Sequence, residues 1–420
     1  MVARTLIERI IAEHLVKPAE VEAGEIVWMG LDVRAARDFG GANVVGHLRR
    51  EFPDGAAVAD PGKTFFTFDC VVPANTIPYA SNQHVCRQFA REHGVRVFDV
   101  QRGIGSHVLM EEGLALPGGT VVNTDSHMNI VGAVGCFGQG MGDADIAFGF
   151  HTGFTWFEVP PSVRIVLEGL LPPGCTGKDV ALGLLRRFGA AGLLNHVVEF
   201  AGDGAAGLDL PARITVSSMA TELGLIAAFF PVDEVTRAFY AGLGVAVSAL
   251  EADVGARYAA EYRVNLSELE PLVATPPAPH CVVPLRELLG KPVDSIFLGS
   301  CTNGRFEDFA AAAGILKGRE VAEGVVANLV PATRPVWSRL LESGLLEELF
   351  VAGVNVSNPG CGGCAAGQIG MTGKGEVQVS TSNRNFPGKQ GAGLTHLASP
   401  LVAAAAAVTG RFTDPRTFLE

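Results

Sequence analysis

Apolar and charged positions follow a helical period at the start of the chain. In the segment MVARTLIERIIAEHLV, the residues Leu6, Ile7, Ile10 and Ile11 fall on one face, as in an amphipathic helix with 3.6 residues per turn. Charged residues lie inside the apolar pattern, so we expect neither a signal peptide nor a membrane span. The pattern predicts an N-terminal helix that packs one face against the protein.

Short β-branched runs alternate with longer stretches rich in alanine and leucine along the rest of the chain. The runs expected as strands are VRIVLEG (163–169), ITVSS (214–218), VDSIFLGS (293–300), VVANLV (325–330), LFVAGVNVS (349–357) and EVQVSTS (376–382). The stretch RFEDFAAAAGIL (305–316) is expected as a helix. This alternation favours an α/β fold with parallel sheets.

Two proline-bearing segments indicate where the chain divides. The segment LEPLVATPPAPHCVVP (269–284) has the composition of an interdomain linker, and PPS (160–162) is a second candidate boundary. We therefore expect three α/β domains, formed by residues 1–160, 161–275 and 276–420.

Composition and charge narrow the class of protein. The 420 residues are 48% hydrophobic, which excludes disorder and suffices for two or three packed domains. The formal net charge is −12 and no basic stripe is visible, so we expect a small-molecule partner rather than a nucleic acid. Eight cysteines without regular close spacing favour free or metal-bound thiols in a reducing compartment, and thus a cytoplasmic protein.

Three cysteines in two glycine-bearing turns carry the candidate chemistry. Cys301 in GSCTNGR follows the apolar run SIFLG, and Cys361 and Cys364 lie in NPGCGGC. Open α/β sheets place their active sites at such strand ends. Three thiolates can hold an iron–sulfur cubane by three corners and leave the fourth iron open as a Lewis acid. A CxxC pair alone is more typical of a redox pair or half a zinc site, and the third cysteine shifts the balance.

Several sequence blocks occur in an order that is typical of one enzyme family. These blocks are NTDSH, TWFEVPPSVRIVLEGLLPPGCTGKDV, GSCTNGR, NPGCGGC, STSNRNFPGK and LASPLVAAAA, and they span nearly the whole chain. Through them the chain resembles the aconitase superfamily, specifically the separate large subunits of isopropylmalate isomerase and homoaconitase. The resemblance implies an aconitase-like, three-domain parallel-sheet α/β architecture without the swivelling fourth domain. It also implies a hydro-lyase that dehydrates a 2-hydroxy di- or tricarboxylic acid to an unsaturated acid and rehydrates it at the neighbouring carbon.

The resemblance assigns roles residue by residue. Cys301, Cys361 and Cys364 would hold a 4Fe–4S cluster whose open iron coordinates the substrate. The candidate catalytic residues are Asp69, Cys70, His107, Asp125, His127 and Glu222. The candidate substrate-binding residues are Arg37, Ser126, Asn303, Asn383, Arg384 and Lys389. Taken singly, most of these polar residues are equally explained as satisfied core residues, helix caps or surface side chains.

Within this set, two groups have more specific expected roles. His107, Asp125 and His127 resemble residues that hydrogen-bond iron-bound water, with Glu222 as their fellow carboxylate. Arg384 resembles an arginine that clamps a substrate carboxylate through its planar fork.

Some positions depart from the family pattern. Asp69-Cys70 stands where relatives carry Asp-His, thought to protonate the departing hydroxyl. Three roles are open for Cys70: packing, a thiol acid, or a fourth ligand that closes the open iron. Arg37 stands where His or Gln is usual, Ser218 replaces a common Asn, and Lys389 replaces a frequent second Arg. Because lysine lacks the bidentate fork, Arg37 could compensate by contacting a carboxylate from another direction.

A partner chain is expected because the sequence stops at RFTDPRTFLE, just after the block that ends the family's large subunit. The small subunit would carry the swivelling domain and the serine base. Since half of the specificity pocket would then lie on that chain, the substrate stays open among 3-isopropylmalate, homocitrate and related alkylmalates. The alternatives are a one-way dehydratase of an unusual substituted malate, an iron- or redox-sensing binding protein, and a structural zinc or redox subunit.

Overall fold

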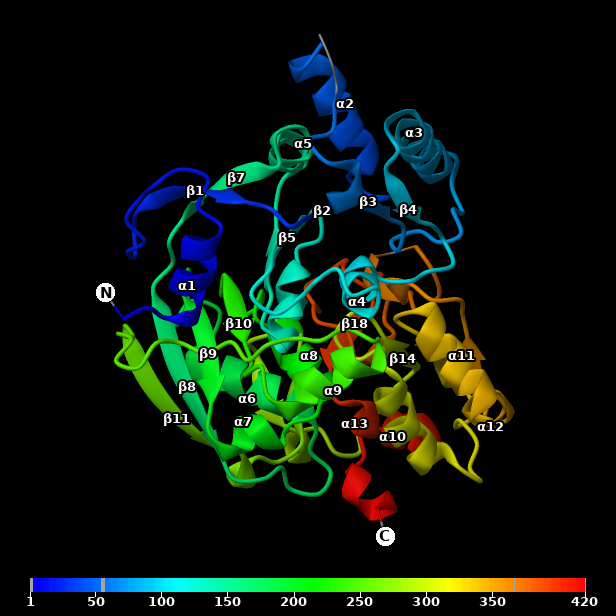
Figure 1. Cartoon of the computed structure of the whole chain (residues 1–420). Coiled ribbons are helices and arrows are strands. Elements are labelled where there is room, and N and C mark those ends of the chain that lie inside the picture. Colours follow the sequence, from blue (N-terminus) through cyan, green and yellow to red (C-terminus); the bar gives the residue numbers. More distant parts are fainter. Residues whose placement is uncertain (1–2, 54–56, 366, 420) are drawn as a thin grey trace.

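The computed structural model describes residues 3–53, 57–365 and 367–419. Its strands form three larger sheets and a two-stranded ribbon. In Figure 1 the blue and cyan sheet lies at the top, the green sheet at the lower left and the yellow to red elements at the lower right. The sheets are wholly or mainly parallel and are flanked by helices, which confirms the expected α/β architecture. Among the described helices, none has the length and apolar character needed to cross a membrane.

The first larger sheet is parallel and has the strand order β4-β3-β2-β5-β6. Its strands are β2 (Val33–Arg37), β3 (Thr64–Thr67), β4 (Arg96–Phe98), β5 (Thr120–Asn123) and β6 (Phe137–Gly140). Its helices are α2 (Gly41–Glu51), α3 (Ile77–His93), α4 (Gly105–Glu111) and α5 (Asp143–Thr152). Because the strands run in one direction, the loops after β2, β3 and β5 meet at the same edge.

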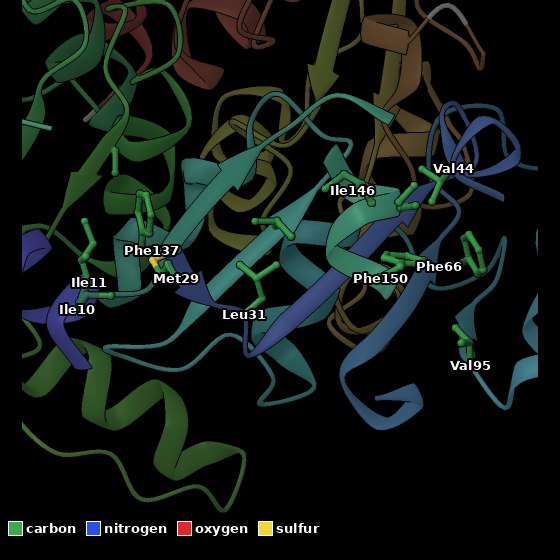
Figure 2. Packing of buried hydrophobic residues seen from close by; sticks show 14 of the residues in the cluster. Ile10, Ile11, Met29, Leu31, Val44, Phe66, Val95, Phe137, Ile146 and Phe150 are labelled. Carbon is green, nitrogen blue, oxygen red and sulfur yellow. The ribbon is translucent and has the colours of Figure 1, made fainter. Parts of the chain in front are cut away.

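The N-terminal helix α1 (Leu6–Glu13) confirms the amphipathic pattern, since its four predicted apolar residues are buried. The antiparallel ribbon consists of β1 (Ile26–Gly30) and β7 (Phe154–Glu158). Figure 2 shows one buried cluster that includes Ile10, Ile11, Met29, Phe66 and Phe150. This cluster joins α1 and the ribbon to the first sheet.

The second larger sheet is parallel and has the order β10-β9-β8-β11. Its strands are β8 (Ser162–Glu168), β9 (Val197–Ala201), β10 (Ala227–Phe229) and β11 (Ala260–Asn265). Its helices are α6 (Gly177–Phe188), α7 (Asp203–Gly207), α8 (Leu210–Ser218) and α9 (Glu234–Gly242). The expectation of a strand at ITVSS is wrong, because these residues end α8. Asp209 caps that helix and Pro211 lies in its first turn, and both are helix-start signals that outweigh β-branched composition here.

The third larger sheet has the order β13-β12-β18-β17-β14-β15-β16. Its strands are β12 (Leu272–Ala274), β13 (Val282–Pro284), β14 (Ser295–Gly299), β15 (Val326–Val330), β16 (Val354–Val356), β17 (Val377–Ser380) and β18 (Leu394–Leu397). Its helices are α10 (Phe306–Leu316), α11 (Arg334–Glu342), α12 (Leu345–Val351) and α13 (Pro400–Thr409). Short 3-10 helices span Pro61–Lys63, Met128–Val134, Leu266–Glu268, Leu285–Glu287, Gly362–Ala365 and Pro415–Phe418.

The proline-rich segment 269–284 forms an edge hairpin rather than an extended linker. Strands β12 and β13 pair antiparallel, and β12 also pairs with β18. Proline is tolerated at such an edge because its missing N–H faces away from the sheet. Since β12 belongs to the third sheet, that sheet begins before the boundary expected at residue 275. The division into three domains stays a prediction.

Candidate active site

Loops at the carboxyl ends of two sheets surround one cavity. They follow β2, β3 and β5 of the first sheet and β14, β16 and β17 of the third. Figure 1 shows the orange segment after β16 between the blue strands above and the yellow and red elements below. The cavity measures about 570 Å³. Its lining includes Arg37, Cys70, Cys301, Cys361, Cys364 and Arg384.

The three expected cluster cysteines face this cavity. Cys301 follows the end of β14, while Cys361 and Cys364 lie in the loop after β16. Gly362 in that loop has a φ of +63°, and a Cβ there would lie 2.5 Å from Phe297 Cζ. Only glycine therefore allows this loop to pack against β14 and present both thiols.

The donor set fits a metal cluster held by thiolates. All eight cysteines are free, and the side chain of Asn383 joins two of the three in the cavity. Its Nδ2 donates to Cys301 Sγ at 3.1 Å, and its Oδ1 accepts from Cys364 Sγ at 3.4 Å. Burial raises the pKa of both thiols, so a bound cation is needed to keep these sulfurs ionised. Thiols grouped in this way could hold an iron–sulfur cluster.

Arg37, the last residue of β2, forms part of the wall on the side of the first sheet. Its Nε donates to Asp69 Oδ1 at 2.7 Å, and its Nη1 lies 3.1 Å from Asp125 Oδ1. Its Nη2 donates to Cys361 Sγ at 2.8 Å. Although burial disfavours the charge, Asp125 and Asp69 raise the pKa of Arg37 well above its usual value. All three guanidinium nitrogens thus already contact protein groups.

The two carboxylates beside Arg37 differ in the direction of their pKa shifts. Burial raises the pKa of Asp69 to about 6, against the opposing effect of Arg37. Burial acts in the same direction on Asp125, but Arg37 and His127 outweigh it and hold the pKa of Asp125 below its usual value. Asp69 is fixed through both oxygens, since its Oδ2 also accepts from the Gly105 N–H at 2.7 Å.

Asp38 organises the turn that carries Asp69 and Cys70. Its carboxylate accepts from the backbone N–H groups of Asp69, Cys70 and Val71 at 3.2, 3.0 and 3.1 Å. It also accepts from Gln83 Nε2 at 3.1 Å. The possible ligand atoms of Asp38, Asp69 and Cys70 lie within 4.8 Å of one another. Because its oxygens are occupied by these donors, Asp38 acts as a clamp on the turn rather than as a metal ligand.

Arg384 belongs to a second polar group at the cavity. Its Nε donates to Glu222 Oε1 at 2.7 Å and its Nη1 donates to Ser126 Oγ at 3.1 Å. His127 Nε2 lies 3.0 Å from the same Glu222 oxygen. Within the described part of the chain, Arg384 Nη2 has no hydrogen-bond partner. Glu222 therefore orients two candidate residues while one end of the guanidinium stays available.

Lys389 adds a second positive charge to the Arg384 side. It lines the cavity, and its Nζ has no carboxylate within ion-pair distance among the described residues. The exposed rings of Phe39 and Phe386 line the same cavity. This side therefore combines available cations with apolar surface, as a site for an organic anion requires.

Five candidates do not line the cavity directly: Asp69, His107, Glu222, Asn303 and Asn383. His107 is fully buried, and its Nε2 hydrogen-bonds to the carbonyl oxygen of Cys301 at 2.9 Å. Burial lowers the pKa of His107 to about 3, so the imidazole is neutral. Asn303 Nδ2 donates to Thr215 Oγ1 and Asp308 Oδ1 at 3.0 and 2.9 Å. His107 and Asn303 thus hold protein groups in and around the loop that carries Cys301. Their expected roles toward substrate and iron-bound water stay predictions.

Lys178 was not among the candidates and is fully buried behind the Arg384 loop. Its Nζ donates to the carbonyl oxygens of Thr381 and Ser382 at 3.0 and 2.5 Å. Burial lowers the pKa of Lys178 to about 8. A sequence signal did exist, because Lys178 lies in the first turn of α6, two residues after the cap Thr176. A positive charge there opposes the helix dipole and is unusual.

Cys70 faces the cavity next to Cys361. Its Sγ lies 3.5 Å from Asp69 Oδ1. A hydrogen bond with Cys361, together with burial, raises the pKa of the Cys70 thiol well above its usual value. Cys70 is therefore a neutral thiol at the site, which keeps its roles as acid, ligand or packing residue open.

The fold and the site are typical of an α/β enzyme. Loops at the ends of its parallel strands place cysteine thiols and positively charged side chains around one cavity. The chain belongs to the aconitase family: the profile described as "Aconitase family (aconitate hydratase)" matches residues 8–292 and 287–410. It is a hydro-lyase of that family, whose members generally depend on a 4Fe–4S cluster.

Named relatives cover essentially the whole chain. The 3-isopropylmalate dehydratase large subunit 1 of Methanopyrus kandleri is 39% identical over 420 residues, covering 99% of this chain and 100% of that protein. The homoaconitase large subunit of Thermus thermophilus is 40% identical, covering 99% and 98%. The holo-form of Thermococcus kodakaraensis aconitase X shares the fold, with a TM-score of 0.51 at 13% identity over 85% of this chain and 84% of that one. Because many relatives are large subunits, a separate small subunit is implied.

Proposed function

We propose that this chain is the large catalytic subunit of a cytoplasmic iron–sulfur hydro-lyase that acts on a 2-hydroxy di- or tricarboxylic acid through a cis-unsaturated acid. The observation that carries this proposal is the meeting of three free cysteines with Arg384 and Lys389 at one cavity. The names of the relatives make 3-isopropylmalate, homocitrate and related alkylmalates the substrates to test.

The proposed cofactor is a 4Fe–4S cluster held by Cys301, Cys361 and Cys364, with one iron open to substrate. When bound, the open iron supplies Lewis-acid activation of the substrate hydroxyl. The chain supports this site by donating to its sulfurs from Asn383 and Arg37. Such contacts orient the ligands and tune their basicity.

Arg384 and Lys389 would bind the substrate carboxylates. Arg384 is oriented by Glu222, and its available Nη2 suits a carboxylate oxygen. His127 is held by the same Glu222 oxygen and, with Ser126, lines the cavity. These two side chains are the proposed hydrogen-bonding groups for the hydroxyl that departs or returns.

A separate small subunit would complete the site. It would carry the swivelling domain and the serine base that removes the proton from carbon. Support for this partner comes from the relatives, which are named as large subunits.

The test is anaerobic co-expression with the candidate small subunit, followed by an ultraviolet assay for the unsaturated acid. The panel contains 2-alkylmalates, citramalate, homocitrate and citrate. We expect iron and sulfide in the purified protein and turnover of a panel member only when both subunits are present. A one-way dehydratase would give the unsaturated acid without the isomer. Zinc in place of iron would contradict the proposal and favour a structural site closed by Cys70, which faces the same cavity.

Replacing Cys70 decides between its open roles. We expect Cys70→His to keep the cluster and to preserve or raise turnover, because histidine can donate a proton from the same position. The measurements are iron content and turnover, compared with Cys70→Ala. Loss of the cluster in both variants would identify Cys70 as a ligand. Unchanged rates in both variants would leave Cys70 a packing residue.

A further inference from the structure

Arg37 is tied into a closed network rather than directed at free cavity space. Its three guanidinium nitrogens contact Asp69, Asp125 and Cys361 at 2.7, 3.1 and 2.8 Å. Its backbone N–H donates to Thr124 Oγ1 at 2.9 Å. The end of β2 is therefore fixed through both its main chain and its side chain.

The same network holds Cys361 from two directions. The backbone N–H of Cys361 donates to the carbonyl oxygen of Asp69 at 2.9 Å, while its sulfur accepts from Arg37. Asp69 in turn accepts from Arg37 and from the Gly105 N–H. This ring of contacts joins the ends of β2 and β3 to the loop after β16.

The charges around Arg37 argue against a substrate clamp. Two buried carboxylates, Asp69 and Asp125, lie against one guanidinium, so they neutralise its charge locally. An incoming substrate anion would meet these carboxylates as well as the cation. A third contact, to the sulfur of Cys361, occupies the remaining nitrogen.

We infer that Arg37 is a positioning residue for Cys361: it fixes the sulfur and donates a charge-assisted hydrogen bond to the thiolate. This inference rests on the proposed cluster and gives Arg37 a role other than the expected compensation for Lys389. An N–H donor and a positive charge at a cluster sulfur stabilise the more negative, reduced state and raise the reduction potential. Arg37 should also slow the loss of the cluster, because it limits rotation of the Cys361 side chain.

The test compares Arg37→Gln with the wild-type protein, both purified anaerobically with the cluster. We expect Arg37→Gln to shift the midpoint potential to a lower value in a spectroscopic redox titration. We also expect about 10- to 100-fold weaker retention of iron against a chelator. Arg37→Lys keeps the charge without the fork, so it should recover part of the potential but little of the iron retention.

Arg384→Gln is the matched control, because it removes a cation from the same cavity without touching a cysteine. It should raise KM or lower kcat while leaving iron retention near the wild-type level. Wild-type potential and iron retention in Arg37→Gln, together with a raised KM, would overturn the inference and return Arg37 to substrate binding. If Arg37→Gln does not fold, the same readouts on Arg37→Lys decide the question. A wild-type protein that binds no iron would instead contradict the proposed function.

Discussion

Two arginines line one cavity, and their guanidinium groups have different numbers of protein partners. Arg37 contacts two carboxylates and a sulfur, whereas Arg384 contacts one carboxylate and one hydroxyl. Their side chains are 13% and 23% exposed, so burial alone does not separate them. The number of fixed acceptors separates them, because it leaves Arg384 with an available donor. Arginine in a cavity is therefore a clamp or a support according to its partners.

The local structure behind the two side chains also differs. Arg37 ends a strand of a parallel sheet, while Arg384 lies in the loop after β17. That loop depends on the buried Lys178, which binds two of its carbonyl oxygens. The difference predicts that variants on the Arg37 side change the cluster, whereas variants on the Arg384 side change substrate binding.

Removing the sulfur of Cys361, which contacts Arg37, should have the largest effect on cluster content and turnover. In Cys361→Ser we expect loss of the cluster and of turnover, because the hydroxyl is a poor substitute for a thiolate ligand. Iron and sulfide analysis with visible absorbance measures this. Cys281→Ser, near the edge hairpin, is the control and should keep both cluster and activity. A full iron complement in Cys361→Ser would exclude Cys361 as a ligand.

Replacing the guanidinium of Arg384 by an ammonium group should change the kinetics but not the cluster content. In Arg384→Lys we expect kcat/KM to fall about 100-fold or more, roughly 3 kcal/mol, with the cluster retained. Steady-state kinetics and iron content on the same preparation measure the two effects. Arg286→Lys, on an exposed arginine paired with Glu270, is the control. Wild-type kinetics in Arg384→Lys would remove Arg384 from the substrate site.

Lys178, which holds the Arg384 loop, should make the free energy of unfolding depend on pH. Because burial lowers the pKa of Lys178 to about 8 from the ordinary 10.5, the unfolded state binds more protons between these values. The free energy of unfolding should thus rise with pH across that interval, by up to about 3 kcal/mol from Lys178.

Lys178→Met removes this titration. The free energy of unfolding of the wild-type protein minus that of Lys178→Met should therefore increase from pH 8 to pH 10, as measured by anaerobic denaturant unfolding. Other titrating groups cancel in the difference. A difference that is constant with pH would show that Lys178 titrates normally.

The smallest effect is expected at Lys389. In Lys389→Ala we expect KM to rise about 10-fold, roughly 1.4 kcal/mol, because one cation without a bidentate fork is lost from the carboxylate site. Lys389→Arg keeps the charge and should stay near the wild-type KM. Equal KM values for the wild-type and alanine variants would place Lys389 outside the substrate site.

Much of the fold was predictable because local patterns agree with it. The amphipathic period of α1 and the apolar run of β14 each describe a segment that is buried in the expected way. The strand predicted at 214–218 failed because a cap and a proline start a helix there. Local propensity is a weak guide where capping and packing favour the other structure.

The site was predictable in its residue types but not in its contacts. The sequence by itself determined that Cys301, Cys361 and Cys364 follow strands and that thiols, carboxylates and arginines are available near strand ends. Only the tertiary structure decided that Arg37 contacts Cys361 across 324 positions of sequence, that Asn303 donates to Thr215 and Asp308, and that Lys178 binds carbonyl oxygens of the Arg384 loop. The physical reason is that hydrogen bonds and charge pairs depend on atoms within a few ångströms. Such distances are set by how two sheets bring their edges together, and a pattern along the chain does not contain them.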